Sequence, residues 1–94
     1  MLERLKMKKK KMKENDTYFV YLKHARESIR ERKITESVIE DAIFNPDETI
    51  PSKKGRKIAH KIIGNRLLRI IYKKHKKAYI VLTAYYTKPE RYTK

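Results

Sequence analysis

The chain has 94 residues, of which 26 are Lys or Arg and 11 are Asp or Glu, so its formal net charge is +15. This length predicts one compact domain, and the absence of cysteine excludes a disulfide framework, a cysteine zinc site and thiol catalysis. We expect a cytoplasmic protein without a membrane span or secretory signal, because no apolar run approaches the ~20 residues that such a span needs. The positive excess predicts a polyanionic partner, with nucleic acid first, an acidic protein second and anionic lipid third.

The charge is distributed unevenly along the chain. Residues 1–14 carry seven basic and two acidic residues (+5), residues 15–50 carry five and eight (−3), and residues 51–94 carry fourteen and one (+13). Residues 1–14 are interpreted as a basic tail, either solvated or acting as a phosphate-contacting arm, and residues 15–94 as a single domain. The concentration of positive charge in one half of that domain is typical of a single-faced anion-binding surface.

Two helices are predicted at the start of the domain. Residues 17–32 place apolar side chains at spacings of three and four, which is one face of a helix. Residues 36–45 form the second helix, with Thr35 as its N-cap. The second helix ends at Asn45-Pro46, because proline disfavours helix in the residue before it.

The rest of the chain is predicted to form strands, since isoleucine, valine, threonine and tyrosine dominate it. The predicted strands cover residues 47–52, 56–63, 66–73 and 78–86, and Pro51 restricts the first of them to a sheet edge. Helices followed by hairpin-linked strands predict an α+β fold, with two N-terminal helices packed on one face of an antiparallel β-meander.

Alternation along the strands divides their side chains between two faces. The apolar set that we expect beneath the helices is Ile58, His60, Ile62, Leu68, Ile70, Tyr72, Ile80, Leu82 and Ala84. The set that we expect on the opposite face is Lys57, Lys61, Arg69, Lys73, Tyr79, Val81, Thr83 and Tyr85.

The loop at residue 64 decides which side chains lie opposite one another. A three-residue loop, with a similar one near residue 76, would give a row of Lys61, Arg69 and Thr83. Two cations directly opposite in a sheet favour an anion between them, and phosphate is such an anion. Neighbouring tyrosines offer stacking surfaces for unpaired bases. A strict two-residue turn of Gly64 and Asn65 is also compatible with the sequence and would break this row.

Several short segments resemble a known group of proteins. The stretch from His24-Ala25 to Ile34-Thr35 is similar to the opening helix of small uncharacterised proteins with an HAxxR-like start. The later segments that fit are Asn45-Pro46-Asp47-Glu48, Gly55-Arg56-Lys57, Ile80-Val81-Leu82-Thr83-Ala84-Tyr85 and Glu90-Arg91-Tyr92. These proteins look related to the RelE/ParE and BrnT toxins, within the barnase–EndoU–colicin–RelE ribonuclease fold. The resemblance covers residues 16–92, and it departs from the group at Ser28, where arginine is frequent, and at Lys33, where glycine is frequent.

The resemblance implies a RelE-like fold and an endoribonuclease toxin of the mRNA interferase type, which needs no metal or small-molecule cofactor. Its partners would be RNA, free or as ribosome-bound mRNA, and an acidic antitoxin protein. Such enzymes use the RNA 2′-hydroxyl as nucleophile and require a base, an acid and cations that stabilise the phosphorane. The catalytic candidates are His24, Lys61, Arg69, Thr83, Tyr85, Arg91 and Tyr92. The nucleic-acid-binding candidates are Arg56, Lys57, Lys73, Lys74, Lys76 and Lys77. The alternative is a non-catalytic module that binds RNA, DNA or the ribosome through the same surface.

Overall fold

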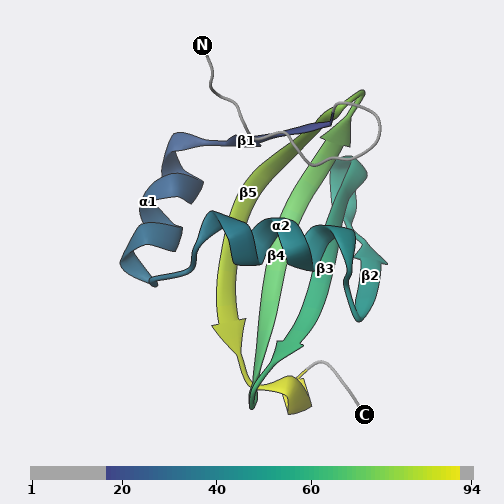
Figure 1. Ribbon diagram of the computed structural model, residues 1–94. Coiled ribbons are helices and arrows are strands. Elements are labelled where there is room, and N and C mark those ends of the chain that lie inside the picture. The colour runs from purple at the N-terminus through teal and green to yellow at the C-terminus, as the bar shows by residue number, and fades with distance from the viewer. Residues whose placement is uncertain (1–16, 92–94) are drawn as a thin grey trace.

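The computed structural model describes residues 17–91, so the tail predicted at residues 1–14 lies outside the described part of the chain. Two helices cover one face of a five-stranded sheet, and α2 crosses β4 and β3 (Figure 1). The elements are β1 (Tyr18–Tyr21), α1 (Lys23–Glu31), α2 (Glu36–Phe44), β2 (Glu48–Pro51), η1 (Lys53–Gly55), β3 (Arg56–Ile63), β4 (Arg66–His75), β5 (Ala78–Thr87) and η2 (Pro89–Arg91). The predicted α+β class is confirmed. Within the described residues, no helix has the length and apolar character needed to cross a membrane.

The chain enters the sheet as a strand, and the helix predicted over residues 17–32 is wrong in its first part. β1 (Tyr18–Tyr21) pairs in parallel with residues 78–81 of β5 and forms one edge of the sheet. Its four residues are aromatic or β-branched, and such residues favour strands when a pairing edge is present. The helix α1 begins at Lys23, after the extended residue Leu22.

The second helix and the edge strand that follows it agree with the sequence. The Thr35 side chain accepts a hydrogen bond of 3.2 Å from the backbone N–H of Val38, which confirms the predicted N-cap. β2 contains Pro51 and lies at the sheet edge, where a missing N–H does not interrupt a ladder. The strand order β1-β5-β4-β3-β2 makes β2 to β5 a meander and adds β1 beside its last strand.

The hairpin between β3 and β4 turns on Gly64 and Asn65 alone, so the three-residue loop is wrong. Gly64 has φ of 64° at the first loop position, where a type II′ turn requires glycine. As a result Lys61 lies opposite Leu68, and not opposite a cation. A one-residue change of register moves every side chain of a strand to the other face, so β3 is reversed relative to the predicted arrangement.

A β-bulge changes the facing of β5 part-way along the strand. Ile71 pairs with Thr83, whereas the next residue, Tyr72, pairs with Val81. Leu82 is therefore an extra residue in β5, and the alternation of side chains restarts after it. The predicted facing is consequently correct for the second half of β5 and wrong for the first half.

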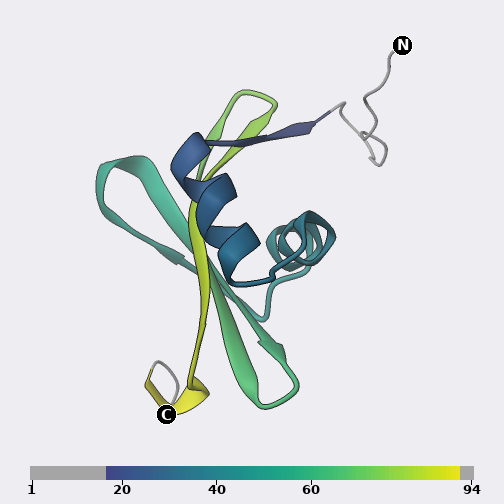
Figure 2. The same ribbon diagram turned by 90° about the vertical axis from the view of Figure 1, so that its left-hand side faces the viewer.

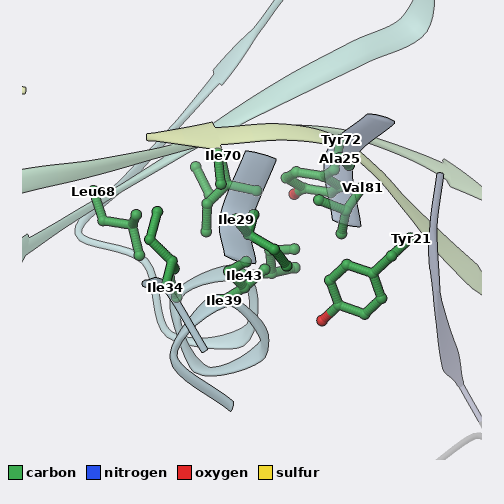
Figure 3. Close-up of a cluster of buried hydrophobic side chains, with 13 residues drawn as sticks. Tyr21, Ala25, Ile29, Ile34, Ile39, Ile43, Leu68, Ile70, Tyr72 and Val81 are labelled. Carbon is green, nitrogen blue, oxygen red and sulfur yellow. The ribbon is translucent and has the colours of Figure 1, made fainter. Parts of the chain in front are cut away.

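The hydrophobic core lies between the helices and the sheet (Figure 3). Its residues from β1 and the helical segment are Tyr21, Ala25, Ile29, Ile34, Ile39, Ala42 and Ile43. Its residues from the other strands are Ala59, Leu68, Ile70, Tyr72, Val81 and Ala84. Burial of these apolar side chains is the main favourable contribution to folding.

The core differs from the predicted apolar face where the register differs. The predicted core residues that do not belong to this cluster are Ile58, His60, Ile62, Ile80 and Leu82. Val81 belongs to the core and Tyr79 packs against it, although both were expected on the opposite face. The two-residue turn at Gly64 and Asn65 accounts for the residues of β3. The turn between β4 and β5 also has two residues, Lys76 and Lys77, where three were expected, so residues 78–81 face the opposite way from the prediction, and the bulge at Leu82 restores the predicted facing.

Tyr21 fixes β1 against the second helix. Its hydroxyl donates a hydrogen bond of 2.9 Å to Oε2 of Glu40, and only 8% of the residue is exposed. Burial, followed by the Glu40 carboxylate, raises the pKa of the Tyr21 phenol well above its ordinary value of ~10. The folded state therefore requires the neutral phenol.

We expect stability to fall at alkaline pH because of Tyr21. Above pH ~10 the unfolded chain releases the phenol proton and the folded chain does not, so rising pH favours unfolding by about 1.4 kcal/mol per pH unit. Tyr21→Phe should lower the free energy of unfolding by about 1–3 kcal/mol at pH 7. Above pH ~10 the free energy of unfolding of this variant should fall less steeply with pH than that of the wild type. Urea unfolding between neutral and alkaline pH measures both effects. Tyr18→Phe, in the same strand but 53% exposed, is the control, and equal alkaline slopes for all three proteins would refute the expectation.

Candidate functional site

Four polar side chains form a continuous row on the face of the sheet that the helices leave uncovered, called the open face below. Glu48 of β2 lies opposite His60 of β3, His60 lies opposite Arg69 of β4, and Arg69 lies opposite Tyr85 of β5. Partners directly opposite in an antiparallel ladder point to the same face. Figure 2 shows the sheet turned nearly edge-on, with α2 on one side of it. We call these four residues the polar row.

Hydrogen bonds connect the polar row from end to end. Glu48 Oε1 lies 3.3 Å from His60 Nδ1, and His60 Nε2 lies 3.0 Å from Arg69 Nη1. Arg69 Nε donates to the hydroxyl of Tyr85 at 2.7 Å. A guanidinium only donates, so His60 Nε2 must be the acceptor and the ring proton resides on Nδ1, which donates to Glu48. The row therefore holds the imidazole of His60 as one neutral tautomer.

The polar row has a buried centre and accessible members on either side. His60 has a polar side chain, and yet only 1% of the residue is exposed. Arg69 and Tyr85 are half-buried, and 53% of the Glu48 side chain is exposed. A buried, bonded imidazole holds the arginine in one orientation, and the arginine in turn holds the phenol. Glu48, Arg69 and Tyr85 are thus the members that a ligand on the open face can contact, and Arg69 and Tyr85 are the two of them that can donate a hydrogen bond to an anion.

Two of the catalytic candidates, Lys61 and His24, lie away from Arg69. Lys61 is on the helix-covered face, where its Nζ donates a hydrogen bond of 2.8 Å to the carbonyl of Asn45 at the end of α2. His24 is exposed on α1, which packs on the opposite side of the sheet from the polar row. Neither residue belongs to the site, and for Lys61 the cause is the two-residue turn.

The other catalytic candidates have mixed positions. Thr83 lies on the open face opposite Ile71, two residues from Tyr85, and it does not face Arg69 because the two-residue turn of Lys76 and Lys77 and the bulge each shift the pairing by one residue. Arg91 is the last residue of η2, and the structure fixes only its backbone. Tyr92 lies outside the described residues. The site therefore retains Arg69 and Tyr85 from the predicted set, with Thr83 beside them.

The basic residues predicted to bind nucleic acid are divided between the two faces. Arg56 and Lys73 lie opposite each other on the open face, four positions along the strands from His60 and Arg69. Lys57 lies opposite the core residue Tyr72, and Lys74 lies 5.0 Å from the ring of Tyr79, so both are on the helix-covered face. Lys76 and Lys77 form the exposed turn between β4 and β5.

Sequence reasoning missed Glu48 and His60. His60 alternates with isoleucines, so parity alone assigns it to the core face. The signal that would have placed it correctly is the Gly64-Asn65 pair, because glycine at the first position of a two-residue loop favours a type II′ hairpin. In that register His60 lies opposite Arg69, and pairing with β2 then adds Glu48.

A model of a family described as "Domain of unknown function (DUF4258)" matches residues 21–86, which is more than two thirds of the 94 residues. The chain belongs to this family. No curated protein and no solved structure matches the chain.

The DUF4258 span runs from the last residue of β1 to the penultimate residue of β5 and contains the whole polar row. The basic tail at residues 1–14 lies outside it. The site is therefore part of the family's domain and not of an extension to it. The resemblance to RelE/ParE and BrnT toxins stays a prediction, because no named relative tests it.

The donor set of the polar row suits protons and anions better than metal ions. Across residues 17–91, no three His, Asp or Glu side chains gather in a way that would hold a metal. The Glu48 carboxylate and the His60 imidazole are hydrogen-bonded to each other, and the Arg69 guanidinium presents N–H donors. An arginine beside a tyrosine is an arrangement that binds a phosphate and transfers a proton.

Proposed function

We propose that this DUF4258 protein is a metal-independent endoribonuclease in which the polar row acts on one phosphate of an RNA strand. The observation that carries the proposal is the hydrogen-bonded chain from Glu48 through His60 and Arg69 to Tyr85 on the open face. Its three hydrogen bonds are 3.3 Å or shorter, and they orient a cation and a phenol side by side. Arg69 and Tyr85 both lie in residues 51–94, and the net charge of +13 in that stretch supports an anionic substrate.

Arg69 would hold the scissile phosphate. Its guanidinium carries N–H donors in a planar arrangement that matches two phosphate oxygens, and its charge stabilises the extra negative charge of the phosphorane. His60 would act as a positioning residue, since its Nε2 accepts from Nη1 and restricts rotation of the guanidinium. Glu48 fixes the tautomer of His60 and so ensures that Nε2 remains an acceptor.

Tyr85 would supply the proton for the leaving group. The phenol oxygen accepts the Arg69 Nε proton, so its own hydrogen is directed away from Arg69. In the proposed step the RNA 2′-oxygen bonds to phosphorus and releases its proton to solvent, while the bond from phosphorus to the 5′-oxygen breaks. Tyr85 gives a proton to that 5′-oxygen and recovers one from water. The products are a 2′,3′-cyclic phosphate and a 5′-hydroxyl, and no metal ion takes part.

Incubation of purified protein with RNA in EDTA tests the proposed reaction. We expect slow cleavage that leaves 2′,3′-cyclic phosphate ends, and no cleavage of an oligonucleotide whose 2′-hydroxyls are replaced by hydrogen. Cleavage of the deoxy substrate would contradict the use of an internal nucleophile. No cleavage of any RNA, free or ribosome-bound, would contradict the enzyme proposal.

A second candidate function is a non-catalytic RNA-binding module. The burial of His60 favours it, because a histidine that is 1% exposed is not accessible to a substrate and also acts as a structural hydrogen-bond partner. In this alternative the same arginine holds a phosphate and the tyrosine stacks on a base. Both candidates predict salt-sensitive RNA binding, so cleavage is what separates them.

An acidic protein partner is expected for the toxin form of the proposal. Residues 51–94 carry fourteen basic residues and one acidic residue, and a net charge of +13 in this stretch favours rapid association with an acidic segment. Expression of the chain alone should slow cell growth, and co-expression of such a partner should restore it. Undisturbed growth at a high level of the unmutated protein would contradict this expectation and favour the binding module.

A further inference from the structure

A pair of cations lies on the open face at a distance from the polar row. Arg56 begins β3 and lies directly opposite Lys73 of β4, and both residues are exposed. The ladder from this pair to His60 and Arg69 runs without a bulge, so all four side chains point to the same face. Four residues at about 3.4 Å each separate the two pairs by about 14 Å.

Arg56 and Lys73 repel each other in the isolated protein. Like charges directly opposite in a sheet are destabilising, and an anion placed between them removes the repulsion. In the described part of the chain, neither side chain forms an ion pair that would neutralise it. The positions that flank the pair supply no carboxylate, since Ser52 lies beside Arg56 and donates its N–H to the Arg56 carbonyl at 2.8 Å, and Ile80 lies opposite Lys73. The pair is therefore arranged to receive an anion from outside.

The surface between the two cationic positions is apolar. Ile58 and Ile71 lie opposite each other midway between the cationic pair and the polar row, and Thr83 continues this line on β5. Ile58 is only 9% exposed and Ile71 is half-buried, so the accessible part of this apolar floor comes mainly from Ile71. An apolar floor cannot form hydrogen bonds with a phosphate, but it can contact the flat face of a base.

We propose that Arg56 and Lys73 form a second phosphate subsite, and that the substrate is a single RNA strand that spans both sites. This inference rests on the proposed function. One phosphate lies at Arg69, an unpaired base lies on Ile71, and a phosphate further along the same strand lies between Arg56 and Lys73. A duplex fits less well, because its base faces are already stacked and cannot reach the apolar floor.

The faces of the sheet provide a matched test. Arg56→Gln with Lys73→Gln removes two charges from the open face, and Lys57→Gln with Lys74→Gln removes two from the adjacent positions on the other face. Thermal unfolding confirms that both proteins fold. With a long single-stranded RNA, the open-face variant should raise KM about tenfold and leave kcat unchanged. The slope of log K against log salt should fall by about 0.7 for each phosphate that the variant no longer neutralises. The variant with both changes on the other face should alter neither quantity beyond about twofold.

Substrate length gives the second measurement. A dinucleotide reaches the polar row but not the second subsite, so the open-face variant should cleave it as the wild type does. The subsite would be overturned if the open-face variant lost cleavage efficiency equally on the dinucleotide and the long strand. It would also be overturned if the two double variants lost equal efficiency on the long strand. The affinity for an uncleavable deoxy oligonucleotide is also compared between the wild type and the two double variants. If the wild type cleaves no RNA, the proposed reaction fails, while this binding comparison still decides whether the subsite exists.

Discussion

Replacement of Arg69 by alanine is expected to lower the rate of RNA cleavage by about 10²–10³-fold, the usual cost of removing one group that stabilises charge in the transition state. Binding of RNA should weaken much less, because the chain has 26 Lys and Arg and most of them remain. The reason for the difference is geometric. Arg69 is the cation that the polar row orients, through hydrogen bonds of 3.0 Å to His60 and 2.7 Å to Tyr85.

Lys61→Ala is the matched control for Arg69→Ala. It removes the same charge from the neighbouring position of the same strand pair, but Lys61 lies on the helix-covered face against the carbonyl of Asn45. Its cleavage rate should stay within about threefold of wild type, as expected for a surface cation outside the site. If Arg69→Ala loses cleavage and binding in equal proportion, Arg69 merely binds RNA. If Lys61→Ala loses as much activity as Arg69→Ala, the assignment of the open face is wrong.

His60 gives the second large effect, and two conservative substitutions distinguish its roles. His60→Gln places an amide oxygen near the position of Nε2, where it can accept from Arg69. His60→Asn places its amide near Nδ1, where it can bond Glu48 but cannot reach Arg69. We expect His60→Asn to lower kcat about 10²-fold and His60→Gln to keep kcat within about tenfold of wild type.

The stability of the two His60 variants is the control. Each loses one of the hydrogen bonds that join the 1% exposed His60 to Glu48 and Arg69, so each should lose about 1–3 kcal/mol in the free energy of unfolding. A purely structural histidine would therefore give two variants with matched stability and matched activity. A positioning histidine gives matched stability and a large difference in kcat. The first result would remove His60 from the mechanism.

The fold was largely predictable because it depends on local signals. Thr35 caps α2, Asn45-Pro46 ends it, and Pro51 restricts β2 to an edge, each through the chemistry of one or two residues. The strand β1 was not predictable in this way. Its helical spacing continues into α1, and it becomes a strand only because β5 offers it a partner at the far end of the chain.

The site was less predictable because the lengths of two turns and the position of one bulge determine it. The choice between two and three residues at Gly64 exchanges Lys61 for His60 opposite Arg69. The two-residue turn at Lys76 and Lys77 and the extra residue Leu82 each shift β5 by one residue, so that Tyr85, and not Thr83, meets Arg69. Neither bulge position nor cross-strand pairing follows from the periodicity of one strand, so Arg69 and Tyr85 were identified individually but their partners were not.

The central claim is that RNA lies on the open face with a phosphate at Arg69. It is tested most directly by NMR titration of the protein with a single-stranded oligonucleotide that lacks 2′-hydroxyls and therefore cannot be cleaved. We predict that the largest shifts occur at the Arg69 Nε–H and at the backbone of Thr83 and Tyr85, with small shifts in α1 and α2. Shifts centred on the helices or on Lys57 and Lys74, with the polar row unchanged, would contradict the claim.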